Sequence, residues 1–319
     1  MREEFGISLV YEARERIAGT VFRTPVLVND EINADVAASV YFKCENLQKT
    51  GAFKARGAAN AVFALSGTVA AAGVCTHSSG NHGAALARAA QLRGIPAYVV
   101  MPSNAPKIKQ AAVRSFGGRI SRCDPTLASR EKAAAAITEE TGATLIHGYD
   151  DWRVMAGQGT VALELTEDVP GLDSILCPVG GGGLLSGTAV VSRALSRSAE
   201  VIGVEPSAVD TAYRSFKSGQ RVTASKSDTV AEGLRTVLGE RPFRVIQHHV
   251  DDIITVGEAS ILKAMRTLWD RLKLVIEPSG AVGYAAMLEY PTRFRGKHIG
   301  VILTGGNVDI DLIQWPGRT

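Results

Sequence analysis

Residues 174–187 (SILCPVGGGGLLSG) decide the fold of this chain. The segment begins with a β-rich apolar run, continues through four consecutive glycines and ends in the apolar start of a helical pattern. Glycines let a backbone approach a ligand and direct several N–H groups to one point, and a helix N-terminus behind them favours a bound anion. We therefore predict a strand–loop–helix unit whose loop binds a phosphate or another anion, although such glycines can also serve a tight turn alone. The loop does not match the dinucleotide-binding motif G-x-G-x-x-G, because Leu185 or Ser186 stands at the position of the last glycine. It does not match a P-loop either, because no Lys-Ser/Thr pair follows the glycines.

Short β-rich runs alternate with longer helical patterns along the rest of the chain. The expected strands are 39–44, 73–77, 97–101, 119–123, 144–147, 174–179, 200–205, 252–256 and 298–303. The expected helices are 54–65, 82–93, 107–116, 127–140, 155–167, 184–195, 261–272 and 282–289. This alternation predicts an α/β fold with a parallel sheet covered on both faces. Such folds bind ligands at the carboxyl ends of strands, where the loops enter helices.

A second strand-to-helix loop, 76–83 (THSSGNHG), carries two serine hydroxyls, a glycine and an asparagine at one helix start. An ordinary N-cap needs only one such group. The additional donors favour a bound carboxylate, with Asn81 left to bond a ring oxygen. An elaborate cap is the alternative interpretation, and His82 alone is more typical of a residue that satisfies local backbone.

Two further segments carry candidate cofactor contacts. In 49–57 (KTGAFKARG), Lys54 begins a helix among apolar residues, where a desolvated lysine loses its proton more easily and can attack an aldehyde. A solvated surface lysine is the alternative. In 303–309 (LTGGNVD), Thr304 stands at the end of a strand, before two glycines. Its hydroxyl could contact a cofactor ring, and a simple turn is the alternative interpretation.

The composition excludes several classes of protein. The 319 residues are 45% apolar and 21% charged with a net charge of +3, which is typical of a soluble globular chain and gives no basic footprint for nucleic acid. No apolar stretch is long enough to suggest a membrane span or a secretory leader. The four cysteines lie far apart within apolar runs, without metal-ligand spacing. We therefore expect reduced core cysteines in a cytoplasmic protein, with no nucleic-acid or membrane partner.

Taken together, the four loops resemble those of the fold-type II pyridoxal-5′-phosphate (PLP) enzymes. Within this family they are most similar to the serine/threonine dehydratases and the serine racemases. The segments AGQGT (156–160), GVEP (203–206) and EPSGA (277–281) also look like elements of this family. The resemblance implies a two-domain, three-layer αβα fold with open parallel sheets, similar to the tryptophan synthase β-subunit. It implies a large PLP-binding domain (1–70 and 149–319) and a small mobile domain (71–148) that carries the substrate-carboxylate loop.

The resemblance also assigns roles to individual residues. Lys54 would hold PLP as a Schiff base and act as the general base at the substrate Cα, with Ser79 as the second catalytic group. The remaining cofactor contacts would be Phe53, Asn81, Gly180, Gly181, Gly182, Gly183, Glu277 and Thr304. The substrate contacts would be Ser78, Ser79, Gly80, Asn81, His82 and Arg130.

For the reaction, the resemblance implies β-elimination from a 3-hydroxy amino acid such as L-threonine or L-serine, which yields a 2-oxo acid and ammonia. Two alternatives stay open: a serine or other amino-acid racemase, and a dehydratase specific for another substrate such as threo-3-hydroxyaspartate or phenylserine. Ser79 occurs in both dehydratases and racemases and does not discriminate. Tyr149 resembles the aromatic residue of bacterial dehydratases and favours elimination.

Two further expectations follow from the resemblance. A divalent Mg or Ca ion would bind near the phosphate loop through Glu205, the carbonyl of Val209 and Asp210, although the acidic residue stands one position early. The small-molecule amino-acid substrate would be processed by a homodimer or homotetramer, as is usual in the family.

Overall fold

Two separate sheets form the framework of this computed structural model, which describes residues 5–78, 80–196, 198–223 and 228–309. The larger sheet has six strands in the order β1-β2-β10-β7-β8-β9, and the smaller has four in the order β5-β4-β3-β6. The strands are β1 (Val26–Leu27), β2 (Ser39–Cys44), β3 (Val74–His77), β4 (Ala97–Pro102), β5 (Arg119–Cys123), β6 (Thr144–Leu145), β7 (Ser174–Pro178), β8 (Glu200–Pro206), β9 (Asp252–Val256) and β10 (His298–Leu303). All nine predicted strands are confirmed. The sequence missed only β1 among these, a two-residue strand that pairs antiparallel to β2 while every other pair is parallel.

The eight predicted helices are also confirmed, with ends that shift by a few residues. They are α3 (Lys54–Phe63), α5 (Asn81–Arg93), α6 (Lys107–Ser115), α7 (Leu127–Thr141), α8 (Trp152–Asp168), α9 (Gly183–Leu195), α12 (Glu258–Leu272) and α13 (Pro278–Glu289). The helices that the sequence reading missed are α1 (Ile7–Ile17), α2 (Asp30–Val36), α4 (Gly67–Ala71), α10 (Thr211–Ser218), α11 (Glu240–His249) and α14 (Pro291–Phe294). Short 3-10 turns, among them η4 (Glu232–Leu234), connect some of these elements.

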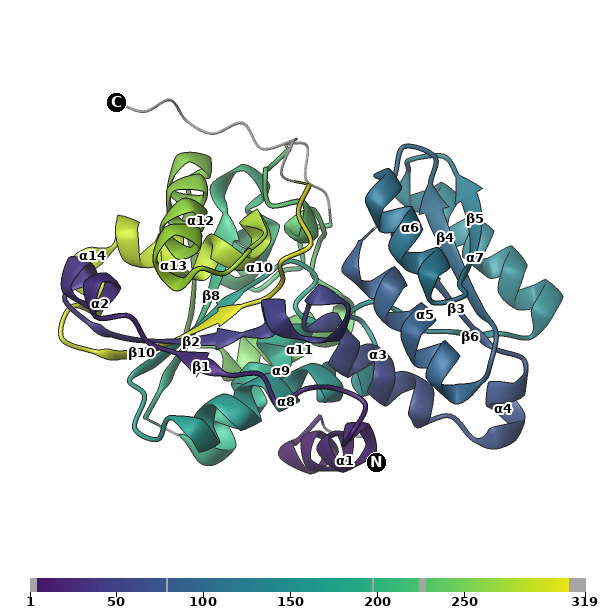
Figure 1. Ribbon diagram of the computed structural model, residues 1–319, viewed down its shortest axis with the longest axis horizontal. Coiled ribbons are helices and arrows are strands. Elements are labelled where there is room, and N and C mark those ends of the chain that lie inside the picture. The colour runs from purple at the N-terminus through teal and green to yellow at the C-terminus, as the bar shows by residue number, and fades with distance from the viewer. Residues whose placement is uncertain (1–4, 79, 197, 224–227, 310–319) are drawn as a thin grey trace.

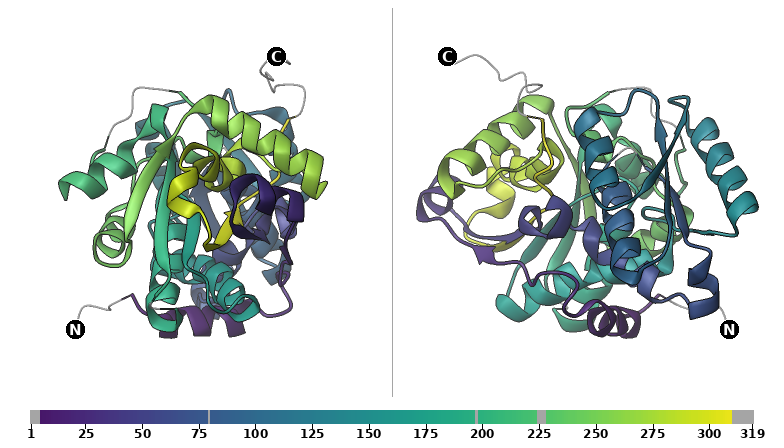
Figure 2. Two further views of the ribbon diagram at one scale, coloured as in Figure 1. Left: turned by 90° about the vertical axis from the view of Figure 1, so that its left-hand side faces the viewer. Right: turned by 45° about the vertical axis from the view of Figure 1, so that its right-hand side comes forward.

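The six-stranded sheet is covered on both faces. Side chains of β2 and β10 pack with α12 and α13 in one apolar cluster, while β7 packs with α8, α9 and α11 in another. Every residue of β7 is buried, because helices lie on both sides of it. This arrangement confirms the predicted three-layer αβα architecture of the larger sheet (Figure 1, Figure 2).

The four-stranded sheet lies to one side of the larger one, with α5, α6 and α7 around it (Figure 1). A cluster of alanines and valines joins α3 and α5 to β3 and β4, and a second small cluster joins α7 to β3 and β4. The carboxyl end of β3 leads directly into the N-terminus of α5, which places the loop between them at the start of that helix. Across the described part of the chain, no helix has the length and apolarity needed to cross a bilayer.

Helices α3, α8 and α9 pack through glycines. A Cβ on Gly157 of α8 would lie 2.6 Å from the Cα of Gly57 in α3, and a Cβ on Gly187 of α9 would lie 2.6 Å from the backbone N of Gly159. Real Cβ contacts are not this short, so a side chain at these positions would push the helices apart. The close packing of α8 against both neighbours fixes the start of α3, where Lys54 stands, relative to the glycine loop before α9.

Candidate functional site

The glycine loop connects β7 to α9 and has room for backbone only. A Cβ on Gly181 would lie 2.2 Å from Cγ of Tyr149, and Gly182 has a φ of +89°, in the left-handed region that favours glycine. The N–H groups in the first turn of α9 have no intrahelical acceptors. The loop therefore offers a set of backbone donors at a positive helix end, which confirms the predicted strand–loop–helix unit and fits a phosphate group.

The hydroxyl of Thr236 is a buried donor beside this loop that the sequence reading missed. Its Oγ1 has no hydrogen-bond partner among the described residues, and it lies 2.9 Å from the position of a Cβ built on Gly180. A buried hydroxyl without a partner costs free energy unless a ligand satisfies it. The segment RTVLG around Thr236 gives no motif that could have identified it.

Lys54 is the first residue of α3 and is partly buried. Its Nζ donates a hydrogen bond to the carbonyl of Gly148 at 2.7 Å, and burial lowers the pKa of the amine to about 8 from its ordinary value of 10.5. The backbone N of Phe53 donates to the carbonyl of Thr304 at 3.0 Å, which brings the end of β10 next to Lys54. The structure thus assembles the lysine segment and the threonine segment at one place.

Asn81, at the start of α5, links the second loop to the larger sheet. Its Nδ2 donates to Oε1 of Glu277 at 2.9 Å, and its Oδ1 accepts a hydrogen bond from Nδ2 of Asn307 at 3.0 Å. The backbone N of Glu277 donates to the carbonyl of Gly305 at 3.0 Å. Burial raises the pKa of the Glu277 carboxyl to about 7, against a smaller opposing effect of Lys109 and the Asn81 hydrogen bond.

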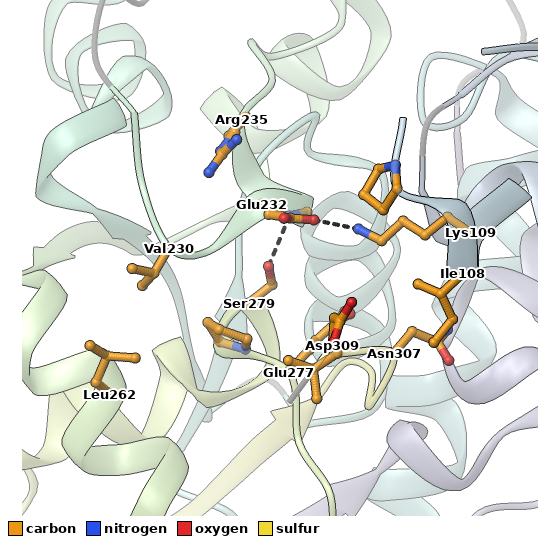
Figure 3. Close-up of a pocket in the computed structure, with 14 residues that line it drawn as sticks. Ile108, Lys109, Val230, Glu232, Arg235, Leu262, Glu277, Ser279, Asn307 and Asp309 are labelled. Carbon is orange, nitrogen blue, oxygen red and sulfur yellow. Dashed lines mark hydrogen bonds and ion pairs between the residues drawn. The ribbon is translucent and has the colours of Figure 1, made fainter. Parts of the chain in front are cut away.

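A cavity of about 240 Å³ opens beside this Asn81–Glu277 pair, between α6 and the η4–α13 region (Figure 3). Lys109 of α6 reaches across it to Glu232 of η4, with 2.5 Å between Nζ and Oε2. Ser279 lies on the same wall and accepts a hydrogen bond from the backbone N of Gly233 at 3.0 Å. The cavity is thus an opening between elements that flank the two sheets.

The expected substrate loop is described except for Ser79, which lies outside the described residues. The backbone N of Gly80 donates to Oγ of Ser78 at 3.2 Å. His82 is buried, its Nε2 lies 3.3 Å from the carbonyl of Ile146, and its Nδ1 has no partner among the described residues. Burial lowers the pKa of His82 to about 3, so the ring is neutral at physiological pH and donates through Nε2. The position of this loop at the N-terminus of α5 fits an anion, as the sequence predicts.

Arg130 belongs to α7 and faces the same region from the smaller sheet. Its Nε is buried and has no partner among the described residues. Burial lowers the pKa of His77 and raises the pKa of Tyr149, and the positive charge of Arg130 acts to lower the pKa of both groups. Substrate binding by Arg130 stays a prediction.

The expected metal ligands have other partners in the structure. Glu205 accepts hydrogen bonds from the backbone N of Ala212 at 3.0 Å and of Tyr213 at 2.9 Å, and burial raises its pKa to about 8. Asp210 accepts a hydrogen bond from Arg214 at 2.8 Å. Within the described ranges, no group of three or more His, Cys, Asp or Glu residues could hold a metal ion. Mg or Ca binding by Glu205, Val209 and Asp210 stays a prediction.

Comparisons with known proteins agree with this geometry. The family model described as "Pyridoxal-phosphate dependent enzyme" matches residues 17–305. A β-hydroxyaspartate dehydratase from Paracoccus denitrificans is 48% identical over 303 residues, which cover 95% of this chain and 96% of that protein. A serine racemase from Arabidopsis thaliana is 44% identical over 316 residues, which cover 97% of this chain and 96% of that protein.

Solved structures give the same result for the fold. The structure of maize serine racemase is similar with a TM-score of 0.94 at 44% identity, covering 96% of this chain and 94% of that one. The crystal structure of a T.th. threonine deaminase is similar with a TM-score of 0.91 at 42% identity, covering 96% of this chain and 99% of that one.

Proposed function

Because the chain belongs to the pyridoxal-phosphate dependent enzymes of fold type II, we propose that it catalyses β-elimination from a 3-hydroxy amino acid such as L-threonine or L-serine, releasing a 2-oxo acid and ammonia. The observation that carries this proposal is a chain of contacts around Lys54. Its amine bonds Gly148, the next residue Tyr149 packs on the glycine loop, and the neighbouring Phe53 bonds Thr304 at the end of β10. The Asn81–Glu277 pair is joined to the same strand end through Gly305. The names of a dehydratase and an ammonia-lyase among the relatives support the reaction class.

The residues present fit the cofactor. Gly180, Gly181, Gly182 and Gly183 would hold its phosphate, and the unpartnered hydroxyl of Thr236 would add a donor there. Lys54 would hold the aldehyde carbon, Phe53 would pack near the ring and Asn81 would bond the ring oxygen. When bound, PLP would supply an electron sink for the charge that develops at the substrate Cα.

The chain's own groups would move the protons. An amine with a pKa near 8 is neutral in a useful fraction at physiological pH, so Lys54 can accept the proton from Cα. Thr304 would bond the pyridine nitrogen through a neutral hydroxyl, which does not hold a proton on that nitrogen as a carboxylate would. By leaving that nitrogen without a proton, Thr304 would favour loss of the β-hydroxyl over return of the proton to Cα.

Ser78, Ser79 and the amides of Gly80 to His82 would hold the substrate carboxylate at the N-terminus of α5. Racemisation is the second candidate function, because serine racemases are among the relatives and Ser79 would provide an acid/base on the face opposite Lys54. The neutral His82 ring, whose pKa is lowered by burial, adds no charge to this loop.

The organisation around the site completes the proposal. We assign 1–70 and 149–319 to a large PLP-binding domain and 71–148 to a small domain that closes on the substrate, in agreement with the separate four-stranded sheet. The homodimer or homotetramer and the cytoplasmic location stay predictions. Light scattering on purified protein measures the first of these.

The test is a panel of PLP-loaded protein with L-serine, L-threonine, threo-3-hydroxyaspartate and 3-phenylserine, in which 2-oxo acid and inverted enantiomer are measured in the same samples. We expect 2-oxo acid and ammonia in equal amounts from at least one of them. Inverted enantiomer without any 2-oxo acid would replace elimination by racemisation.

A lysine control tests the assignment of the cofactor residue. Borohydride reduction followed by peptide mapping should place the pyridoxyl group on Lys54, and Lys54→Ala should lose both this adduct and turnover. Lys49→Ala is the matched control, because the Nζ of Lys49 lies over the ring of Phe22, 3.7 Å from its centroid. Normal turnover of Lys54→Ala would show that another group does this work.

A further inference from the structure

The turn 147–150 lies between β6 of the smaller sheet and α8, which covers the larger one. Its first residue, His147, bonds the backbone that follows it: Nδ1 accepts hydrogen bonds from the backbone N of Asp150 at 3.0 Å and of Tyr149 at 3.4 Å. A side-chain acceptor that binds the N–H groups two and three residues further on holds the chain in a turn, as the side chains of Asn and Asp commonly do. His147 therefore closes this turn from within.

The turn contacts two parts of the proposed cofactor site. The carbonyl of Gly148 accepts the hydrogen bond of the Lys54 amine at 2.7 Å. The ring of Tyr149 packs on the glycine loop, since a Cβ on Gly181 would lie 2.2 Å from its Cγ. Gly148 and Tyr149 share one planar peptide unit, so the direction of this carbonyl and the placement of the ring depend on each other. A change in the turn would therefore move the acceptor of the lysine amine and the cover of the glycine loop together.

The far end of the turn is anchored on α11. The carboxylate of Asp150 accepts the backbone N–H groups of Glu240 and Arg241, each at 3.0 Å. These N–H groups belong to the first turn of α11 and have no acceptors within the helix. The turn is thus fixed at one end by a helix start and closed at the other by Nδ1 of His147.

The ring of His147 is held so that Nδ1 can accept these bonds. It packs edge-on against the ring of Tyr149, with 4.5 Å between centroids, and against the ring of His77, with 5.4 Å between centroids. Burial lowers the pKa of His147 to about 4 from its ordinary value of 6.5, so the ring is neutral at physiological pH. Because Nδ1 accepts two bonds, the proton of the neutral ring is on Nε2.

We propose that His147 is a positioning residue whose Nδ1 closes the turn 147–150. The closed turn places the Gly148 carbonyl at the amine of Lys54 and the ring of Tyr149 on the glycine loop. This inference rests on the proposed function in one respect, namely that Lys54 is the amine that captures PLP. Nδ1 already accepts two backbone N–H groups, so His147 acts through the turn and not on the substrate. The role belongs to the position of one acceptor atom, which separates it from a packing role of the ring.

Two amide substitutions at this one position separate the acceptor atom from the ring. The side-chain oxygen of asparagine reaches the place of Nδ1, whereas the oxygen of glutamine lies one carbon further out, at the place of Nε2. His147→Asn therefore keeps the acceptor and His147→Gln moves it away, while both variants lose the ring. His248→Gln is the matched control, because His248 is exposed on α11.

Hydrogen exchange of the apoprotein measures the turn directly, in peptides that cover 147–151. We expect the amides of this segment to exchange at least about tenfold faster in His147→Gln than in the wild type, and within about threefold of the wild type in His147→Asn. Strands β7 and β10 should exchange at wild-type rates in both variants. Equal exchange of the turn in the two variants would overturn the proposal, and so would a loss of protection that extends to β7 and β10, because it would show a general loss of structure.

Capture of PLP by Lys54 measures the consequence for the site. The PLP concentration that gives half of the borohydride-trapped adduct on Lys54 should rise about tenfold or more in His147→Gln. It should stay within about threefold of the wild type in His147→Asn and in His248→Gln. The same half-trapping concentration in the Asn and Gln variants, whether normal or raised in both, would overturn the proposal. If the wild type forms no adduct on Lys54, the proposed function fails, while hydrogen exchange still decides whether His147 closes the turn.

Discussion

Replacing Glu277 with glutamine should flatten the dependence of the free energy of unfolding on pH. The buried carboxyl has a pKa of about 7 in the folded protein, against an ordinary value of 4.5. The folded state therefore binds this proton more tightly than the unfolded state does. The resulting stabilisation is fully present below the unfolded pKa, and it is lost as pH rises through the folded pKa.

The size of the effect follows from the difference between the two pKa values. A difference of about 2.5 between 7 and 4.5 corresponds to roughly 3 kcal/mol, and most of this loss falls between about pH 5 and pH 7. Because Glu277 is 7% exposed, solvent screens this contribution little. Glutamine has nearly the same shape and keeps an oxygen for the Asn81 hydrogen bond, but it does not titrate.

Urea titrations of the apoprotein at pH 5, 6, 7 and 8 measure the effect. The difference in unfolding free energy between Glu277→Gln and the wild type should change by about 2–3 kcal/mol from pH 5 to pH 8, with the wild type losing stability relative to the variant. Glu12→Gln is the control for loss of one negative charge, because its side chain is exposed on α1. Parallel pH profiles for Glu277→Gln and the wild type would refute the argument that Glu277 is protonated by burial.

Two further substitutions test the support of the lysine segment. Arg56 is fully buried and pairs with Glu45 and Glu164. Arg56→Met should cost about 3–5 kcal/mol, because Glu45 loses its guanidinium partner and Glu164 keeps only Lys43, and an unchanged urea midpoint would contradict this. Gly157→Ala places a Cβ 2.6 Å from the backbone of α3 and should lower stability by about 1–3 kcal/mol, whereas Gly67→Ala, with open space around it, should not. Thermal unfolding of both glycine variants in parallel measures the difference.

The sequence predicted the regular elements of the sheets well, and the misses have a physical reason. Strands such as 252–256 (DIITV) are short runs of β-branched apolar residues between polar stretches, and their pattern does not depend on distant parts of the chain. β1 has two residues, too few for any periodicity, and exists because it pairs with β2. Helix α11 carries a proline and two histidines, and its apolar side chains are buried only after it packs against α9 and α10 in the folded chain.

The site was predictable where glycine and hydroxyl groups follow a strand. The glycine loop, Lys54 and Thr304 could be chosen because each stands at a strand end or a helix start in an unusual local composition. Thr236 could not, because its proposed role depends on the glycine loop, far away in the sequence, and its own segment carries no motif. Segments that meet only in the folded state carry no local signal.

The bond between Asn81 and Glu277 joins residues 196 positions apart, and it couples two parts of the proposed chemistry. Asn81 begins α5, and the loop 78–80 that precedes it carries the proposed substrate donors. Asn81 and loop 78–80 are joined at the start of one helix, so they would move together. A shift of α5 relative to the larger sheet would therefore change two proposed contacts at once: that of Asn81 with the cofactor ring and that of loop 78–80 with the substrate carboxylate. The Lys109–Glu232 ion pair crosses the same opening from α6, and α6 packs against α5. If the small domain closes on the substrate as proposed, capture of the carboxylate and closure of the opening would be one motion of the α5–α6 unit, which a hydrogen bond and an ion pair join to the larger sheet.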